Sequence, residues 1–300
     1  MLLICKLISR LPSVVLYAMG GALGWVVYLL SPSYRRHFDG NWALFADWKT
    51  GQAMPTQQTR RPGVPLTLST ERQAAIREAG RQILELPRVW LRSPEENYRL
   101  IQKVKGWEQM ERARANGDGV MLLTPHMGCF ELIGVYVSAH MPMTCLFRPA
   151  RQAFTRELMQ SGRERSGIRL APANLSGVRT LMRALNNREV IGILPDQTPQ
   201  VGEGQWAAFF GRSAWSMTLA ARLSAVSGVT TLLTWCERLP RGEGYCLHFI
   251  PLSPLKGSTP ERVQQINAAV EQLVAEHPAQ YLWGYNRYKR PRGAPPPPVS

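Results

Sequence analysis

The stretch VMLLTPHMGCFELIGVYVS (residues 120–138) decides the fold of this 300-residue chain. Its first five residues, all apolar except Thr124, predict a short buried strand that Pro125 ends. The residues from Phe130 to Ser138 predict a helix. A buried strand that leads through a short turn into a helix is typical of α/β proteins, so the stretch indicates that class.

The same stretch places a base close to a carboxylate. Within one continuous helix, five steps of 100° would leave His126 and Glu131 about 140° apart, pointing away from each other. If His126 instead follows the strand and Gly128 opens the helix, Glu131 can reach back to the imidazole. A carboxylate on one ring nitrogen fixes the tautomer and leaves the other nitrogen as a general base. The pair forms two-thirds of a Ser-His-Asp triad, so the nucleophile would be a hydroxyl of the substrate.

A histidine five positions before a carboxylate is common by chance, and the alternative is a histidine that only caps a helix. Four further blocks support the catalytic interpretation. They are FRP (147–149), ILPDQ (193–197), FFG (209–211) and WGYNRYK (283–289). Together with LTPHMGCFEL (123–132), these blocks resemble the lysophospholipid acyltransferase superfamily, and within it the bacterial lipid A late acyltransferases. Cys129 and Phe130 stand where that branch usually has Asn-Trp, and the last block matches more loosely.

The resemblance implies an O-acyltransferase that moves a fatty acyl group from an acyl carrier protein thioester, or from CoA, to a hydroxyl of a lipid A precursor. His126 would deprotonate the hydroxyl, Glu131 would orient His126, and backbone N–H groups near Gly128 would bind the oxyanion. No metal or organic cofactor is expected. Cys129 could be mistaken for a nucleophile, but its place two residues before Glu131 favours packing. The alternative within the superfamily is an acyltransferase that acts on a lysophospholipid or an aminolipid.

The other blocks supply the candidate substrate-binding residues. Arg148 follows a predicted strand and would bind acceptor phosphate, and Arg151 is a second candidate; a solvated surface arginine is the alternative for both. Asp196 would position the acceptor or an arginine, with Gln197 beside it, although an Asp after Pro often serves only a turn. Arg212 would lie at the level of lipid headgroups. The aromatic loop around it, residues 206–215, is either core, an acyl tunnel or a membrane contact.

The net charge of +15 indicates an acidic partner. Nucleic acid, anionic membrane lipid and an acidic carrier protein all qualify. For an acyltransferase we expect the lipid and the carrier protein, and no nucleic acid. A basic, membrane-anchored nucleic-acid-binding module remains the non-enzyme alternative, because residues 281–292 are aromatic and basic; it leaves the ordered blocks unexplained. The five cysteines are scattered without metal-binding spacing, which is typical of a reducing compartment.

The termini predict an anchor and a tail. Residues 11–32 carry no charge and are long enough to cross a membrane, so residues 1–34 are interpreted as an uncleaved anchor, with a signal peptide as the alternative. Gly20 and Gly24 form a small-residue face that could pack against another helix. Residues 35–290 would form the acyltransferase domain at the cytoplasmic face of a bacterial inner membrane. Residues 48–68 are read as a linker and 291–300 as a proline-rich disordered tail.

Strand-like and helix-like segments alternate along the domain. The expected strands are 120–124, 144–147, 190–194, 229–237 and 245–250. The expected helices start at Ser69 and cover 104–116, 130–138, 154–165, 178–187, 216–227 and 260–276, with a break or kink at Pro87. This order predicts a mixed β-sheet flanked by helices, similar to that of glycerolipid acyltransferases.

Overall fold

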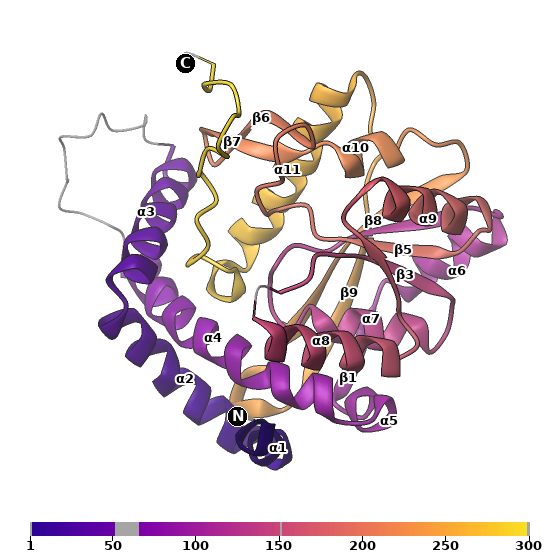
Figure 1. Cartoon of the computed structure of the whole chain (residues 1–300). Coiled ribbons are helices and arrows are strands. Elements are labelled where there is room, and N and C mark those ends of the chain that lie inside the picture. The colour runs from indigo at the N-terminus through magenta and orange to yellow at the C-terminus, as the bar shows by residue number, and fades with distance from the viewer. Residues whose placement is uncertain (1, 52–65, 151, 299–300) are drawn as a thin grey trace. The chain divides into compact units, whose positions relative to one another are not determined.

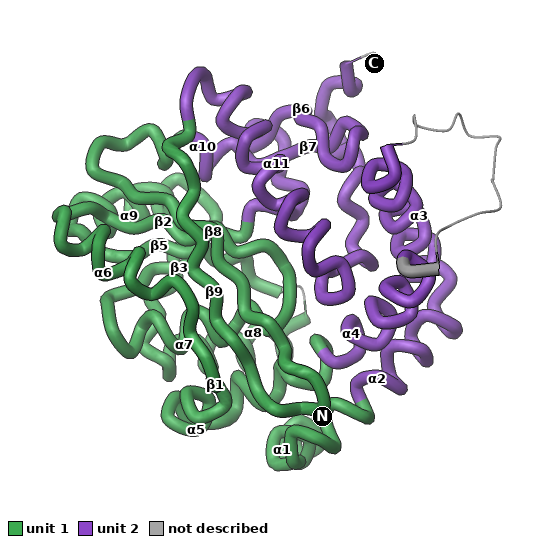
Figure 2. Tube along the Cα trace, turned by 180° about the vertical axis from the view of Figure 1, so that it is seen from behind, with its two compact units in different colours: residues 1–19, 82–194, 222–255 green, residues 20–81, 195–221, 256–300 purple. Residues whose placement is uncertain are grey.

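The computed structural model describes residues 2–51, 66–150 and 152–298. The chain divides into two compact units (Figure 2). Unit 1 comprises residues 1–19, 82–194 and 222–255, and unit 2 comprises residues 20–81, 195–221 and 256–300. Two long helices, α2 (Ser13–Leu30) and α4 (Leu66–Leu91), begin in one unit and end in the other.

Unit 1 contains a seven-stranded mixed sheet with strand order β1-β9-β8-β2-β5-β3-β4 (Figure 1). Its strands are β1 (Ile101–Lys105), β2 (Gly119–Leu123), β3 (Met143–Phe147), β4 (Arg169–Pro172), β5 (Val190–Ile193), β8 (Val229–Arg238) and β9 (Tyr245–Pro251). Neighbouring strands are parallel except β8 and β9, which form an antiparallel pair around the short helix η1 (Pro240–Gly242). β2, β5 and β3 therefore end at one edge of the sheet, where α/β proteins build their sites.

Helices cover both faces of this sheet. In unit 1 they are α1 (Leu2–Arg10), α5 (Pro94–Tyr98), α6 (Trp107–Ala115), α7 (Glu131–Ser138), α8 (Ala153–Arg165) and α9 (Leu175–Asn186). Val120 and Leu122 of β2 share one apolar cluster with side chains of α6, α7 and α8. α9 covers the opposite face (Figure 1). It lies so close to β2 that a Cβ added to Gly119 would contact the backbone of Leu185 in α9. β2 is thus buried on both faces, which explains its unbroken apolar run.

Unit 2 contains α3 (Pro32–Lys49), α11 (Thr259–Glu276), the short helix η2 (Pro278–Gln280) and most of the small helix α10 (Leu219–Leu223). Its two strands, β6 (Gly204–Phe209) and β7 (Arg212–Met217), form an antiparallel hairpin. Phe210 and Gly211 both have positive φ, as a two-residue hairpin turn of type I′ requires. Phe209, Phe210 and Trp215 are buried, so the aromatic loop predicted around Arg212 is a hairpin whose rings belong to the core.

The predicted mixed α/β fold is confirmed, and so is a single helix over most of residues 11–32. Several boundaries differ. The helix expected over 104–116 begins only at Trp107, after Gly106 with φ +77°, and the segment before it is strand β1. α4 continues through Pro87 to Leu91, and the helix expected over 216–227 is reduced to α10. β4 and the β6–β7 hairpin were not expected.

The expected linker and tail fall partly outside the described residues. Of residues 48–68, Lys49 ends α3 and Leu66 begins α4, whereas 52–65 are not described. Residues 291–298 contain no helix or strand, but Ala294 is buried and the Pro295 carbonyl accepts a hydrogen bond from the Trp206 indole at 3.0 Å. Residues 299–300 lie outside the described part of the chain.

Candidate active site

The loop between β2 and α7 carries the predicted base and carboxylate. Thr124 N–H donates to the Ile193 carbonyl at 2.9 Å and so extends the pairing of β2 with β5. Gly128 has φ +56° and forms a parallel bridge with Cys236 of β8. Cys129 N–H then donates to the Cys236 carbonyl at 2.9 Å. The loop is therefore held between two strands, and the predicted path of strand, turn and helix is the one observed.

His126 and Glu131 lie in different environments. His126 is half-buried, and its ring meets the edge of Phe130 with centroids 5.1 Å apart and planes at 62°. Glu131 opens α7 and is buried, with 5% of its side chain exposed. The amino end of a helix favours a carboxylate in its first turn, because the free N–H groups there carry partial positive charge.

Arg163 of α8 binds the Glu131 carboxylate through two hydrogen bonds. Arg163 Nε donates to Glu131 Oε2 at 2.9 Å, and Arg163 Nη2 donates to Oε1 at 2.5 Å. Only 16% of the Arg163 side chain is exposed, and its guanidinium lies 5.8 Å from the centre of the Phe147 ring. Burial lowers the pKa of Arg163, but the charge and hydrogen bonds of Glu131 outweigh it and raise this pKa above its usual value. Arg163 was not among the residues predicted from the sequence.

Each carboxylate oxygen has two acceptor directions, so Glu131 can bind Arg163 and still accept from a third donor. The Arg163 bonds fix the plane of the carboxylate, and they neutralise its charge in a buried setting. Glu131 is therefore a pre-oriented acceptor, five residues after a half-buried imidazole.

Arg148 is exposed and follows β3 directly, at the same edge of the sheet as His126. Only β5 separates β3 from β2. Arg151, the second predicted phosphate ligand, lies outside the described residues.

Asp196, Gln197 and Arg212 belong to unit 2. Asp196 is buried and accepts a hydrogen bond from Tyr281; burial first, and then the charge of Asp196, raise the pKa of the Tyr281 hydroxyl. Gln197 is half-buried, and Arg212 is exposed with its guanidinium 5.2 Å from the centre of the Tyr288 ring. These residues stay candidate substrate ligands.

Cys129 is buried and its thiol interacts with that of Cys236. Burial, followed by the bond to Cys236, raises the pKa of Cys129 well above its usual value. A buried protonated thiol is a poor nucleophile, so the interpretation of Cys129 as a packing residue agrees with its surroundings.

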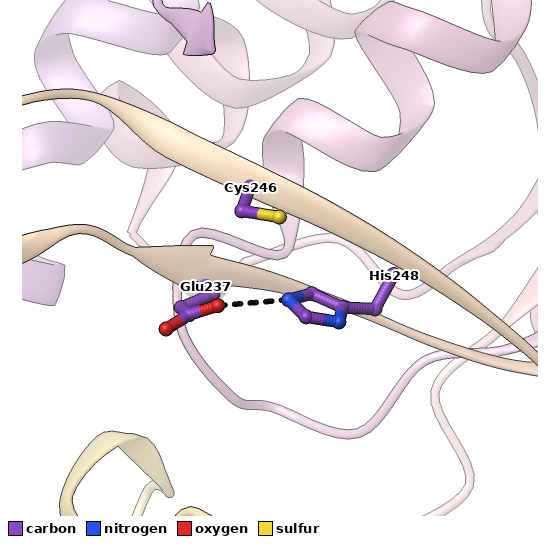
Figure 3. Close-up of side chains that lie close together, drawn as sticks. All are labelled: Glu237, Cys246 and His248. Carbon is purple, nitrogen blue, oxygen red and sulfur yellow. Dashed lines mark hydrogen bonds and ion pairs between the residues drawn. The ribbon is translucent and has the colours of Figure 1, made fainter. Parts of the chain in front are cut away.

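A second group of titratable side chains lies on β8 and β9, where strand pairing aligns Glu237 with Cys246 (Figure 3). His248 Nε2 lies 2.8 Å from Glu237 Oε2, and the potential ligand atoms of the three residues all lie within 4.8 Å of one another. β1 aligns Lys103 with Cys246 and Lys105 with His248. These two cations disfavour a divalent metal ion, and we assign none to the cluster.

The α/β fold and the base–carboxylate loop agree with the acyltransferase class that the sequence blocks indicate. A family model described as bacterial lipid A biosynthesis acyltransferase matches residues 2–290. The chain belongs to this family and is an O-acyltransferase.

Individual relatives are moderately similar. The lipid A biosynthesis palmitoleoyltransferase of Escherichia coli (strain K12) is 28% identical over 223 residues, 73% of this chain and 71% of the relative. The lipid A biosynthesis lauroyltransferase of the same organism is 25% identical over 220 residues, 72% of this chain and 71% of the relative. The phosphatidylinositol mannoside acyltransferase of Mycobacterium tuberculosis (strain CDC 1551 / Oshkosh) is 24% identical over 275 residues, 87% of this chain and 84% of the relative.

Proposed function

We propose that this enzyme transfers a fatty acyl group from an acyl carrier protein thioester to a hydroxyl of a lipid A precursor. The observation that carries the proposal is the β2–α7 loop. It joins a half-buried His126 to a buried, pre-oriented Glu131 within a chain of the lipid A acyltransferase family. The net charge of +15 suits an acidic carrier and a phosphorylated lipid at the cytoplasmic face of an inner membrane.

In this mechanism, His126 accepts the proton of the acceptor hydroxyl while that oxygen attacks the thioester carbonyl. Glu131 holds the imidazole in one orientation and one tautomer. Backbone N–H groups near Gly128 donate to the tetrahedral oxyanion, and one such donor contributes about 3 kcal/mol in comparable sites. Collapse of the intermediate breaks the carbon–sulfur bond, and the carrier thiol leaves with the proton from His126. An ester forms, a thioester is consumed and the base is regenerated.

A second acceptor class is also supported by one comparison. The match to the phosphatidylinositol mannoside acyltransferase extends over more of this chain than the matches to the two lipid A enzymes of E. coli. The alternative is therefore the same chemistry on another lipid, with a lysophospholipid or an aminolipid as further acceptors. CoA is the alternative donor.

The mechanism is tested by His126→Ala, which should abolish transfer while the fold is kept, and by Glu131→Gln, which should leave a residual rate. His140→Ala is the matched control, because this exposed histidine just after α7 contacts the Tyr136 ring, with centroids 4.6 Å apart, and has no role in the scheme. Acyl transfer is measured by mass spectrometry with a lipid A precursor and with a phosphatidylinositol mannoside. Turnover in folded His126→Ala equal to that of His140→Ala would refute the mechanism. Activity on the mannoside alone would favour the second acceptor.

Arg148 is proposed to bind acceptor phosphate beside the base. Arg148→Lys keeps the charge but loses the planar pair of donors, so we expect partial activity, whereas Arg148→Ala should slow transfer to a phosphorylated acceptor more than thioester hydrolysis. Both rates are measured in one variant. An equal fall would show that Arg148 serves the donor or the fold instead.

A further inference from the structure

Among the described residues, α2 is the one helix long and apolar enough to cross a membrane. Its own residues form two apolar faces. At 100° per residue, the exposed large side chains fall within an arc of about 160°. They are Val14, Val15, Met19, Val26, Leu29 and Leu30. The buried residues occupy the rest of the circumference, and they are Leu16, Gly20, Gly21, Gly24 and Tyr28.

The buried face of α2 packs on α4, backbone against backbone. A Cβ on Gly80 would lie 2.1 Å from Gly24 N and 2.2 Å from Gly20 O, and a Cβ on Gly24 would lie 2.0 Å from the Ile76 carbonyl. The small-residue face predicted from the sequence thus joins two helices of the same chain. Because this contact is so close, α4 must accompany α2 wherever α2 lies.

α4 brings arginines to every level of α2. Arg88 Nη1 donates to Ser13 Oγ at 2.7 Å near the start of α2, and Arg72 Nη2 donates to the Tyr28 hydroxyl near its end. Arg81 and Arg77 lie between these two levels. A Cβ added to Gly20 would lie 2.6 Å from the Cα of Arg81, and a Cβ added to Gly24 would lie 3.1 Å from the Cα of Arg77. If α2 crossed the bilayer, these arginines would be distributed across its hydrocarbon core, where charged side chains are expensive.

The charges that flank α2 agree with a helix that stays on one side of the membrane. Lys6 and Arg10 precede it, Arg35 and Arg36 follow it, all four are exposed, and residues 1–38 contain no Asp or Glu. A spanning helix would place one pair on each side, against the bias of basic residues towards the cytoplasm. A helix in the plane of the membrane places both pairs in the same layer of anionic headgroups.

We propose that α2 lies in the plane of the bilayer, with its exposed apolar face and that of α1 inserted into one anionic leaflet. The two ends of the chain then lie on the same side of the membrane. In α1, which directly precedes α2, Leu3, Ile4 and Leu7 are also exposed and fall within an arc of about 100° beside Lys6 and Arg10. This inference rests on the proposed membrane location of the enzyme, but it does not depend on which lipid is acylated.

The decisive experiment maps both ends of the full-length protein in bacterial cells. One protein carries an epitope tag before Met1, and another carries the tag after Ser300. Each is treated with protease in spheroplasts and, separately, in inside-out vesicles. Both proteins are also assayed for acyl transfer. We expect both tags to be protected in spheroplasts and cleaved in vesicles. Cleavage of the N-terminal tag alone in spheroplasts would overturn the in-plane arrangement. The acyl-transfer assay reports separately on the proposed function.

A matched pair of substitutions tests the inserted face. Val26→Glu places a charge on the exposed arc of α2, and Leu175→Glu makes a comparable change at an exposed leucine of α9. Binding of each protein to phosphatidylglycerol-containing and to phosphatidylcholine vesicles is measured by flotation. Loss of one buried apolar side chain should weaken the binding of Val26→Glu roughly tenfold, with Leu175→Glu unchanged. Equal binding of both variants, or no preference for the anionic vesicles, would contradict the proposal.

Discussion

The Arg163–Glu131 pair offers the sharpest test of how the site is built. In Arg163→Met, a side chain of similar length removes the cation and leaves the Glu131 carboxylate buried without this partner. Breaking a buried pair in this way costs about 3–5 kcal/mol of unfolding free energy. Glu131 also loses the two bonds that fix its plane. Because a displacement of about 1 Å can cost a factor on the order of 100 in rate, we expect a fall of that size in kcat/KM.

Two further variants separate charge from packing. Arg165→Met is the control, since Arg165 is an exposed residue of the same helix. Its side chain donates two long hydrogen bonds, of 3.2 Å and 3.3 Å, to the Leu91 and Trp90 carbonyls. Its loss should cost about 1 kcal/mol or less. The double variant Arg163→Met, Glu131→Gln removes both charges, so it should recover much of the lost stability but none of the activity.

Stability is measured by urea unfolding with tryptophan fluorescence, and activity by transfer from acyl carrier protein thioester. If Arg163→Met is as stable and active as Arg165→Met, the pair contributes neither to the fold nor to the site. If the double variant is no more stable than Arg163→Met, an unpaired buried charge is not the cause of the loss.

Two other changes have clear expected outcomes. Cys129→Ser should retain most activity, because the acyl group is proposed to pass directly to the lipid; a thioester trapped on Cys129 during turnover would contradict direct transfer. Glu271 has a raised pKa, mainly through burial, so its ionised form destabilises the fold at pH values above its unfolded-state pKa. Glu271→Gln keeps an acceptor for the Phe210 N–H. The midpoint of its thermal unfolding should exceed that of the wild type at pH 7, and the two midpoints should converge as the pH falls towards 4.5. Identical midpoints at every pH would show that the charge has no cost.

The central strands and the β2–α7 loop could be predicted because their signals are local. β2 is buried on both faces and therefore reads as an apolar run, and Pro125 and Gly128 mark the turn that follows it. β1 lacked such a signal. It has the sequence IQKVK, its burial is incomplete, and it becomes a strand because β9 pairs with it. Pairing of this kind depends on residues far away in the chain.

The partner of Glu131 was missed for the same reason. Arg163 lies 32 positions after Glu131, on a helix that also carries Arg156 and Arg165, and nothing local distinguishes the three. The C-terminal aromatic and basic block was open to a nucleic-acid interpretation. In the structure, however, Trp283 and Arg287 are buried, and Arg287 donates to the Trp215 carbonyl at 2.9 Å and to Ser216 Oγ at 2.6 Å. This part of the block holds unit 2 together.

The Arg163 bonds also bear on what Glu131 can contribute to catalysis. In a triad whose carboxylate has no cationic neighbour, the full negative charge stabilises the imidazolium. Here the guanidinium neutralises much of that charge at hydrogen-bonding distance. In the proposed mechanism, Glu131 then serves mainly to fix the His126 ring and its tautomer. A neutral glutamine side chain at this position still offers one acceptor oxygen, which is why Glu131→Gln should be less damaging than His126→Ala. If both substitutions abolished transfer equally, Glu131 would have to act through its charge, and Arg163 could not neutralise it as the geometry implies.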